Sequence, residues 1–140
     1  MKLLVECLLL NMPKLVDTNL IVRFLLNDNP QQALASEKVF KQSSDLVITD
    51  IAVAETVWTL QSFYGFSRQE IVEKIFKFLQ SKNFICNQEL LFNSLFLYLN
   101  HNISFVDAYF AAYAEIEKLE GIYSFDEGLD KIKTIKRFKP

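Results

Sequence analysis

Four acidic residues occupy unusual places in this sequence. Three lie next to short apolar stretches and one lies on the apolar face of a predicted helix: Asp17, Glu55, Asp107 and Asp126. A carboxylate in apolar surroundings is costly to bury unpaired, and no basic residue stands directly beside any of the four. Acids that converge also raise one another's pKa by repulsion. Divalent cations relieve that repulsion, so the pattern predicts a metal site.

Magnesium fits such a site, because Mg²⁺ prefers carboxylate oxygens and keeps several of its own waters. A metal held by acids lowers the pKa of a bound water, orients it and stabilises the leaving oxygen of a phosphodiester. This chemistry needs acids and no nucleophilic side chain. The four acids are therefore candidate catalytic residues and candidate metal ligands.

Each acid except one also has a structural explanation when it is considered alone. Asp17 can cap the helix that follows it, and Asp107 fits a capping pattern that begins at Ser104. Asp126 begins a sequence that resembles an ordinary turn. Glu55 has no such explanation, since an acid on an apolar helix face caps nothing. The functional interpretation rests on the set of four more than on any one member.

Strands and helices are expected to alternate around these acids. Short apolar stretches predict strands at residues 14–18, 46–49, 84–86, 122–125 and 134–138. Capping residues and helical spacing predict helices at residues 20–26, 30–41, 50–64, 67–79, 88–100 and 104–120. Trp58, on the helix of Glu55, is interpreted as a core residue. This alternation predicts an α/β fold whose parallel sheet is covered on both faces and carries the acids at its carboxyl edge.

The composition indicates one folded domain with a slightly acidic balance. Of the 140 residues 51% are hydrophobic, three are glycine, and the formal net charge is −2. These values argue against disorder and against binding of nucleic acid by overall positive charge. Positive charge would have to come from metal ions or from a local patch. One basic patch, which fits equally well as a solubilising tail, comprises Lys131, Lys133, Lys136, Arg137 and Lys139.

Residues 1–11 form a separate apolar segment ahead of a second methionine, Met12. Glu6 interrupts the segment, no small-residue cleavage site follows, and it is far shorter than the ~20 residues of a membrane span. We interpret 1–11 as an upstream extension or a disordered N-terminal segment, and 12–140 as the folded domain. The two cysteines have no metal-site or redox spacing and fit a reducing, cytoplasmic location without a membrane anchor.

Four stretches that contain the acids resemble the motifs of the PIN-domain family, and especially those of the VapC toxins of type II toxin–antitoxin systems. They are Pro13-Lys14-Leu15-Val16-Asp17-Thr18-Asn19, Thr49-Asp50-Ile51-Ala52-Val53-Ala54-Glu55, Phe105-Val106-Asp107-Ala108-Tyr109-Phe110-Ala111-Ala112 and Tyr123-Ser124-Phe125-Asp126. Each motif is degenerate, but the four acids occur in the family's order from about Met12 to the C-terminus.

The resemblance implies a PIN-like α/β fold, with three α/β/α layers around a central, mostly parallel sheet of four to five strands. It also implies an endoribonuclease that depends on Mg²⁺ or Mn²⁺ and cuts single-stranded RNA, as the toxin of a toxin–antitoxin pair. A cognate antitoxin would cover its site, and the chain would form a homodimer. The N-terminal extension is the chief departure from the family's pattern.

The resemblance also implies a role for each matching residue. Asp17 and Asp107 would be the principal metal ligands. Glu55 and Asp126 would complete the site or position water. Thr18 or Asn19 would hydrogen-bond an acid or a phosphate.

Other classes of protein remain open. An aspartyl-nucleophile phosphatase also has an acid after its first strand, but Asn19 stands where that class needs a second aspartate. A receiver-like phosphoacceptor domain shares the acid-rich sheet edge, but its helper lysine is not evident. A PIN-like binding partner without turnover would keep the fold, although the presence of all four acids argues against it.

Overall fold

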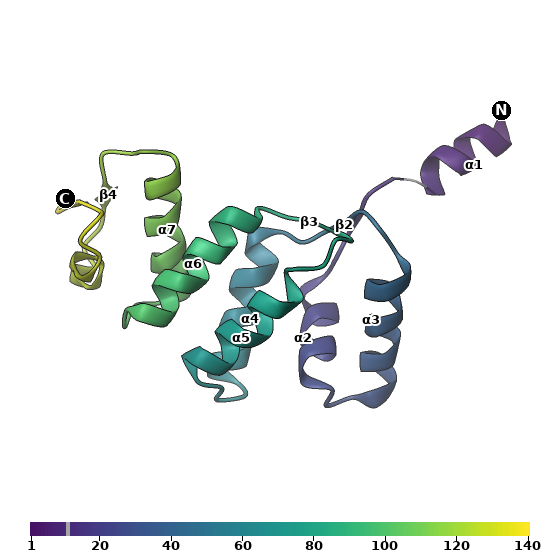
Figure 1. The fold of residues 1–140 in the computed structure, drawn as a ribbon, viewed down its shortest axis with the longest axis horizontal. Helices are drawn as coiled ribbons and strands as arrows, with labels where there is room; N and C mark the ends of the chain where they lie inside the picture. The colour runs from purple at the N-terminus through teal and green to yellow at the C-terminus, as the bar shows by residue number, and fades with distance from the viewer. Residues whose placement is uncertain (11) are drawn as a thin grey trace.

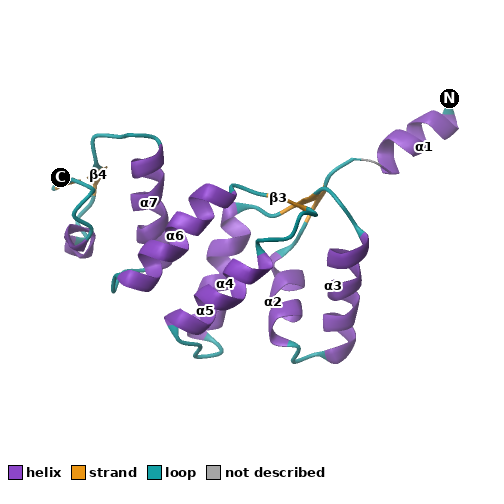
Figure 2. Cartoon of the chain, viewed as in Figure 1, coloured by secondary structure: helices purple, strands orange, loops and turns teal. Residues whose placement is uncertain are grey.

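The computed structural model describes residues 1–10 and 12–140, which form helices around short strands (Figures 1 and 2). In chain order the elements are α1 (Lys2–Leu10), β1 (Lys14–Leu15), α2 (Thr18–Leu26), α3 (Pro30–Gln42), β2 (Leu46–Val47), α4 (Asp50–Ser62), α5 (Arg68–Phe78), β3 (Phe84–Ile85), α6 (Gln88–Asn100), α7 (Phe105–Ile116), β4 (Ile122–Tyr123), the 3-10 helix η1 (Glu127–Lys131) and β5 (Arg137–Phe138).

The strands confirm the predicted α/β class with parallel pairing, and they are divided between two sheets. β2 lies between β1 and β3 in a three-stranded sheet, whereas β4 pairs with β5 alone. All of these pairs are parallel. One central sheet of four to five strands was expected, and the described residues instead hold three strands in one sheet and two in the other.

Packing at the C-terminal end explains why the sheets are separate. η1 buries Leu129, which is 1% exposed, and the turn after η1 buries Ile132, which is 2% exposed. Both belong to the same hydrophobic core as Ile103, just before α7. Burial of each such side chain contributes about 1.5–3 kcal/mol, which outweighs the few hydrogen bonds that a two-residue strand can form. In Figure 1, β4 and β3 accordingly lie on opposite sides of α6 and α7.

Several helices begin at the residues that the sequence indicates. Asn29 caps α3 with Pro30 at its first position, and Ser67 forms a reciprocal capping box with Glu70 at the start of α5. Ser104 caps α7 by accepting a hydrogen bond from the backbone N–H of Asp107. These caps confirm the predicted helix starts.

The prediction that Trp58 belongs to the core is wrong. Its side chain is 57% exposed and packs edge-on against Phe63, with ring centroids 5.3 Å apart. The buried face of α4 is formed by smaller residues, Ala52, Val53, Thr56, Val57 and Leu60. Trp58 directly follows the buried Val57, and consecutive side chains of an α-helix point about 100° apart. The side chain of Trp58 therefore points away from the buried face.

The N-terminal segment forms α1, whose residues 2–8 are exposed. Leu3 and Leu4, for example, are 83% and 68% exposed. Asn11, at the end of the segment predicted to be an extension, lies outside the described residues. That residues 1–11 are an upstream extension stays a prediction. In the described part of the chain, no helix is both long and apolar enough to cross a membrane.

Candidate functional site

Asp17 and Glu55, the N-terminal pair, lie near the carboxyl end of β1. Asp17 is the N-cap of α2, and its carboxylate accepts a hydrogen bond from the backbone N–H of Asn19 at 3.3 Å. The hydroxyl of Thr18 donates to Oε2 of Glu55 at 3.2 Å. Thr18 is buried, whereas both carboxyl residues are exposed. Because Thr18 follows Asp17 directly, its hydrogen bond ties α4 to the end of β1 and sets Glu55 near Asp17.

No basic side chain of the described residues forms an ion pair with the N-terminal pair. Arg23, six residues after Asp17, instead contacts Asp28 at 2.8 Å. The carboxylates therefore keep free oxygen atoms, since a cap or a single hydroxyl uses only part of what a carboxylate can accept.

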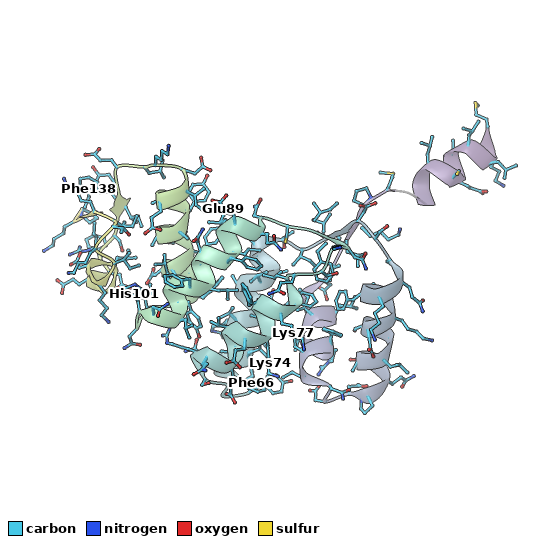
Figure 3. The ribbon with its side chains drawn as sticks, viewed as in Figure 1. Phe66, Lys74, Lys77, Glu89, His101 and Phe138 are labelled. Carbon is cyan, nitrogen blue, oxygen red and sulfur yellow. The ribbon has the colours of Figure 1, made fainter. Side chains whose placement is uncertain are left out.

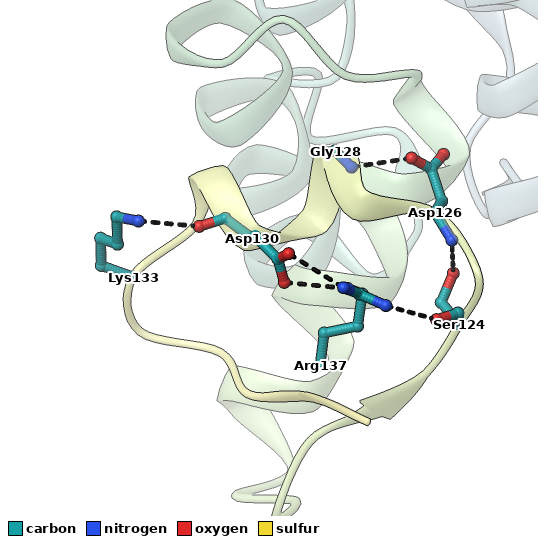
Figure 4. A network of polar contacts seen from close by, with 6 residues as sticks. All are labelled: Ser124, Asp126, Gly128, Asp130, Lys133 and Arg137. Atoms are coloured by element: carbon teal, nitrogen blue, oxygen red, sulfur yellow. Dashed lines mark hydrogen bonds and ion pairs between the residues drawn. The ribbon is translucent and has the colours of Figure 1, made fainter. Parts of the chain in front are cut away.

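Asp107 and Asp126, the C-terminal pair, come from the start of α7 and the residues after β4. Asp126 precedes η1, and its Oδ1 accepts a hydrogen bond from the backbone N–H of Gly128 at 2.8 Å (Figure 4). The two carboxyl groups lie near enough for each to shift the pKa of the other. The turn after β4 therefore delivers Asp126 to the first turn of α7.

The two carboxyl groups of the C-terminal pair have opposite pKa shifts. Burial raises the pKa of Asp107, and the neighbouring Asp126 raises it further. The hydrogen bond from Gly128 lowers the pKa of Asp126, and the contact with Asp107 and the nearby Lys131 and Arg137 lower it too. When the pair holds one proton, that proton belongs on Asp107. A divalent cation would replace the proton and relieve the repulsion.

A network of polar contacts fixes the turn that carries Asp126 (Figure 4). Arg137 donates to both carboxylate oxygens of Asp130, at 2.9 and 3.0 Å, and to the carbonyl oxygen of Ser124 at 3.0 Å. The hydroxyl of Ser124 accepts from the backbone N–H of Asp126 at 2.9 Å. Part of the basic patch noted in the sequence thus makes internal contacts that position an acid.

Asp50 connects three helices and was missed as a site residue by the sequence interpretation. Its carboxylate accepts from the amide of Asn87 at 3.2 Å and from the hydroxyl of Tyr109 at 2.6 Å. Burial and the Asp50 contact raise the pKa of Tyr109 to about 12. Since Tyr109 lies two residues after Asp107, Asp50 holds the first turn of α7 against α4. Asp50 directly follows Thr49 in the family-like stretch that contains Glu55. That position was the signal in the sequence by which Asp50 could have been identified.

The structure brings the four predicted acids together two by two. Within residues 1–10 and 12–140 there is no group of three or more acidic, histidine or cysteine side chains placed to hold one metal ion. The donor chemistry itself suits Mg²⁺ or Mn²⁺, because every candidate ligand is a carboxylate oxygen. Each pair supplies part of a ligand set.

Comparison with known proteins gives one family. A family model described as the PIN domain matches residues 14–135, a range that contains both carboxylate pairs and the polar network around Asp126. No curated protein matches the chain.

Proposed function

The chain belongs to the PIN domain family, and on that basis we propose that it is a metal-dependent endoribonuclease that hydrolyses single-stranded RNA. PIN domains are generally nucleases, they typically use divalent metal ions, and PIN nucleases bind RNA. The observation that carries the proposal is the placement of the acids. Asp17 comes shortly after β1 and Asp126 shortly after β4, and Glu55 and Asp107 lie near them on neighbouring helices.

In this proposal all four acids are both metal ligands and catalytic groups. Asp17 and Asp107 are the principal ligands, and Glu55 and Asp126 complete the site or position water. Bound Mg²⁺ or Mn²⁺ would supply an activated water and charge stabilisation at the scissile phosphate. Thr18 fixes the orientation of Glu55 through its hydroxyl, and the side chain of Asn19 is available to a phosphate.

We further propose that the chain is the toxin of a toxin–antitoxin pair, with a cytoplasmic location and a homodimeric state. A cavity of about 200 Å³ lies between α4 and α7, lined by Ile51, Ala54, Val106 and Phe110 among others. Three of these side chains are exposed, Ile51 to 78%. Ala54 and Val106 directly precede Glu55 and Asp107, so an apolar antitoxin segment seated in this cavity would also cover the acids.

The test is cleavage of a single-stranded RNA by the purified chain, with Asp17→Asn beside the wild type. Asparagine caps helices about as well as aspartate, so this variant keeps the start of α2. Asp45→Asn is the matched control, because Asp45 is exposed at the opposite, amino end of the same sheet. We expect cleavage with Mg²⁺ or Mn²⁺ by the wild type and the control, and none by Asp17→Asn or in EDTA. Cleavage that survives EDTA or Asp17→Asn would refute the mechanism.

A second function, a PIN-like RNA-binding partner without turnover, is favoured by one observation, the division of the acids into two pairs. Binding of the same RNA without metal-dependent cleavage would support it. Induced expression in bacteria tests the toxin role separately from RNA cleavage and from RNA binding. We expect growth arrest by the wild type and normal growth with Asp17→Asn.

A further inference from the structure

Trp58 is a large apolar side chain that the fold leaves in solvent. It is 57% exposed, whereas Val57 before it is 1% exposed. Phe63, which packs against it, is 72% exposed, so the two rings form one apolar patch on the surface. Burial of a tryptophan or phenylalanine side chain is among the largest stabilising contributions in a core, and the fold makes little use of it here. Exposed apolar patches of this kind mark sites of interaction.

Trp58 lies on the same face of α4 as the candidate ligand Glu55. Residues three apart on a helix are neighbours, with Cβ atoms about 5–6 Å apart. Ile51, one turn before Glu55, is 78% exposed on this face, and Glu55 is exposed as well. One turn before Trp58, Ala54 lines the cavity between α4 and α7 together with Val106. A substrate held at the acids therefore meets Trp58 within one helical turn.

The ring of Trp58 is held in place and keeps an open face. Its centroid lies 5.3 Å from that of Phe63, and the two ring planes meet at 82°. An edge-on contact covers at most one of the two faces of the indole. Among residues 1–10 and 12–140, no cation lies over this ring, and Phe63 is its one aromatic partner. A planar ligand can therefore stack on Trp58 without first having to order it.

The rest of α4 suits a nucleic-acid strand. The helix begins beside β2 and ends near the loop that carries Phe66 (Figures 1 and 3). From Thr56 to Ser62 it has no charged residue, so its exposed face beyond Glu55 does not repel phosphate groups. Unpaired bases of RNA stack on aromatic side chains, and stacking accepts every base because each has a flat π-face. A base next to the scissile phosphate is therefore the ligand that fits this position.

We propose that Trp58 stacks on an unpaired base of the RNA, adjacent to the phosphate held by the acids. The proposal rests on the proposed function for that phosphate and adds the group that holds the neighbouring nucleotide. Stacking would hold the strand with one phosphodiester at the acids. In a duplex each base is already stacked and paired, and exposing it costs free energy. Trp58 therefore favours single-stranded RNA over a duplex.

The first test uses the fluorescence of Trp58, the one tryptophan in the sequence. The wild type is titrated with a single-stranded oligoribonucleotide in Ca²⁺ in place of Mg²⁺, and gels confirm that the RNA stays intact. A sugar-phosphate chain of the same length without bases is the control. We expect saturable quenching by the oligoribonucleotide and none by the abasic chain, because only a base stacks. RNA that fails to bind, that binds without quenching, or that quenches no more than the abasic chain overturns the proposal.

The second test compares the affinity of variants for the same oligoribonucleotide, measured from the anisotropy of a dye on the RNA. Trp58→Ala should bind about tenfold more weakly, a typical loss for one stacked base. Trp58→Phe keeps an aromatic face and should retain most of the affinity. Phe96→Ala is the matched control and should bind like the wild type, since Phe96 is 62% exposed on α6, which carries none of the four candidate acids. Equal affinity in the wild type and Trp58→Ala would overturn the proposal and leave Trp58 as a contact for a protein partner.

The stacking subsite and the proposed function can fail separately. Quenching by RNA in a protein that never cleaves it would refute the proposed function and leave the stacking subsite standing. In a protein that cleaves RNA, Trp58→Ala should raise KM and change kcat little, because a stacked base is bound alike in the ground state and the transition state. Cleavage without quenching, and with KM unchanged in Trp58→Ala, would refute the subsite and leave the nuclease standing.

Discussion

The two carboxylate pairs belong to motifs of one family, yet their electrostatic surroundings differ. The N-terminal pair is exposed and receives neutral donors, the hydroxyl of Thr18 and the backbone of Asn19. In the C-terminal pair, Asp107 lies against a second carboxyl group, with Lys131 and Arg137 acting on its partner. Water solvates the exposed carboxyl groups of the first pair. The second pair is under like-charge repulsion.

This difference predicts that a bound metal ion would have different effects on stability and cleavage at the two pairs. At the C-terminal pair, a bound cation would relieve repulsion that exists in its absence, so it should stabilise the fold as well as support cleavage. At the N-terminal pair, the cation would gain ligands but relieve little. Changes to the first pair should therefore reduce activity alone, and changes to the second pair should alter both activity and stability.

The largest effect is expected for Asp126→Asn. Asparagine can still accept the hydrogen bond of Gly128, so the turn should fold, but a charged ligand is lost. We expect RNA cleavage to fall by more than about 100-fold, beyond the loss typical of a supporting residue around a metal. Glu127→Gln, the exposed neighbour, should retain activity. Equal losses of cleavage in Asp126→Asn and Glu127→Gln would show that cleavage depends on the charge of the turn and not on Asp126 as a metal ligand.

Leu129→Ala should cause the largest loss of stability, because it removes the side chain that fixes the C-terminal unit beside α7. We expect the free energy of unfolding in urea to fall by about 2–4 kcal/mol. Leu119→Ala, at a side chain that is 51% exposed, is the control and should change it much less. Similar losses in both would contradict the assigned anchoring role.

Tyr109→Phe removes the hydroxyl that binds Asp50 and should lower the free energy of unfolding by about 1–2 kcal/mol. Tyr113→Phe, on the next turn of α7, is the control. The pKa of Tyr109 is raised from 10.0 to about 12, so its contribution is complete below pH 10 and is lost as the pH rises toward 12. The difference between wild type and Tyr109→Phe should narrow over that range. A constant difference would exclude the hydrogen bond as its source.

Asp107→Asn has the smallest expected effect on stability and the opposite sign. Because the pKa of Asp107 is raised in the folded chain, its ionisation at neutral pH opposes folding. In metal-free buffer we expect the variant to be more stable, by roughly 0.5 kcal/mol since solvent screens the pair. The gain should disappear below the ordinary pKa of aspartate, 3.8. A clear loss of stability at neutral pH would instead assign Asp107 a helix-capping role.

Local chemistry made much of the fold predictable. Capping residues such as Asn29 and Ser67 satisfy backbone N–H groups that no other group in the first turn can reach, so they mark helix starts in the sequence itself. The division into two sheets could not be predicted in this way. It depends on whether Leu129 and Ile132 pack beside α7 or elsewhere, which is a balance between distant surfaces.

The candidate site was predictable to a similar degree. The acids could be identified because a carboxylate in apolar company needs a reason, and their positions after strands follow from the parallel sheet. Their grouping into two pairs could not be predicted from the sequence, because it follows from the separation of the two sheets. Asp50 was missed because its partner Tyr109 is 59 positions away in the sequence. Trp58 was misplaced because helical spacing alone does not say which face of α4 is buried.

Binding of Mn²⁺, followed by electron paramagnetic resonance, tests most directly whether the two carboxylate pairs act as one metal centre. The wild type, Asp17→Asn and Asp126→Asn would be titrated under the same conditions. We predict that either substitution weakens binding at the same site, because both pairs supply ligands to it. Unchanged Mn²⁺ affinity in Asp17→Asn, with binding abolished in Asp126→Asn, would contradict a shared centre.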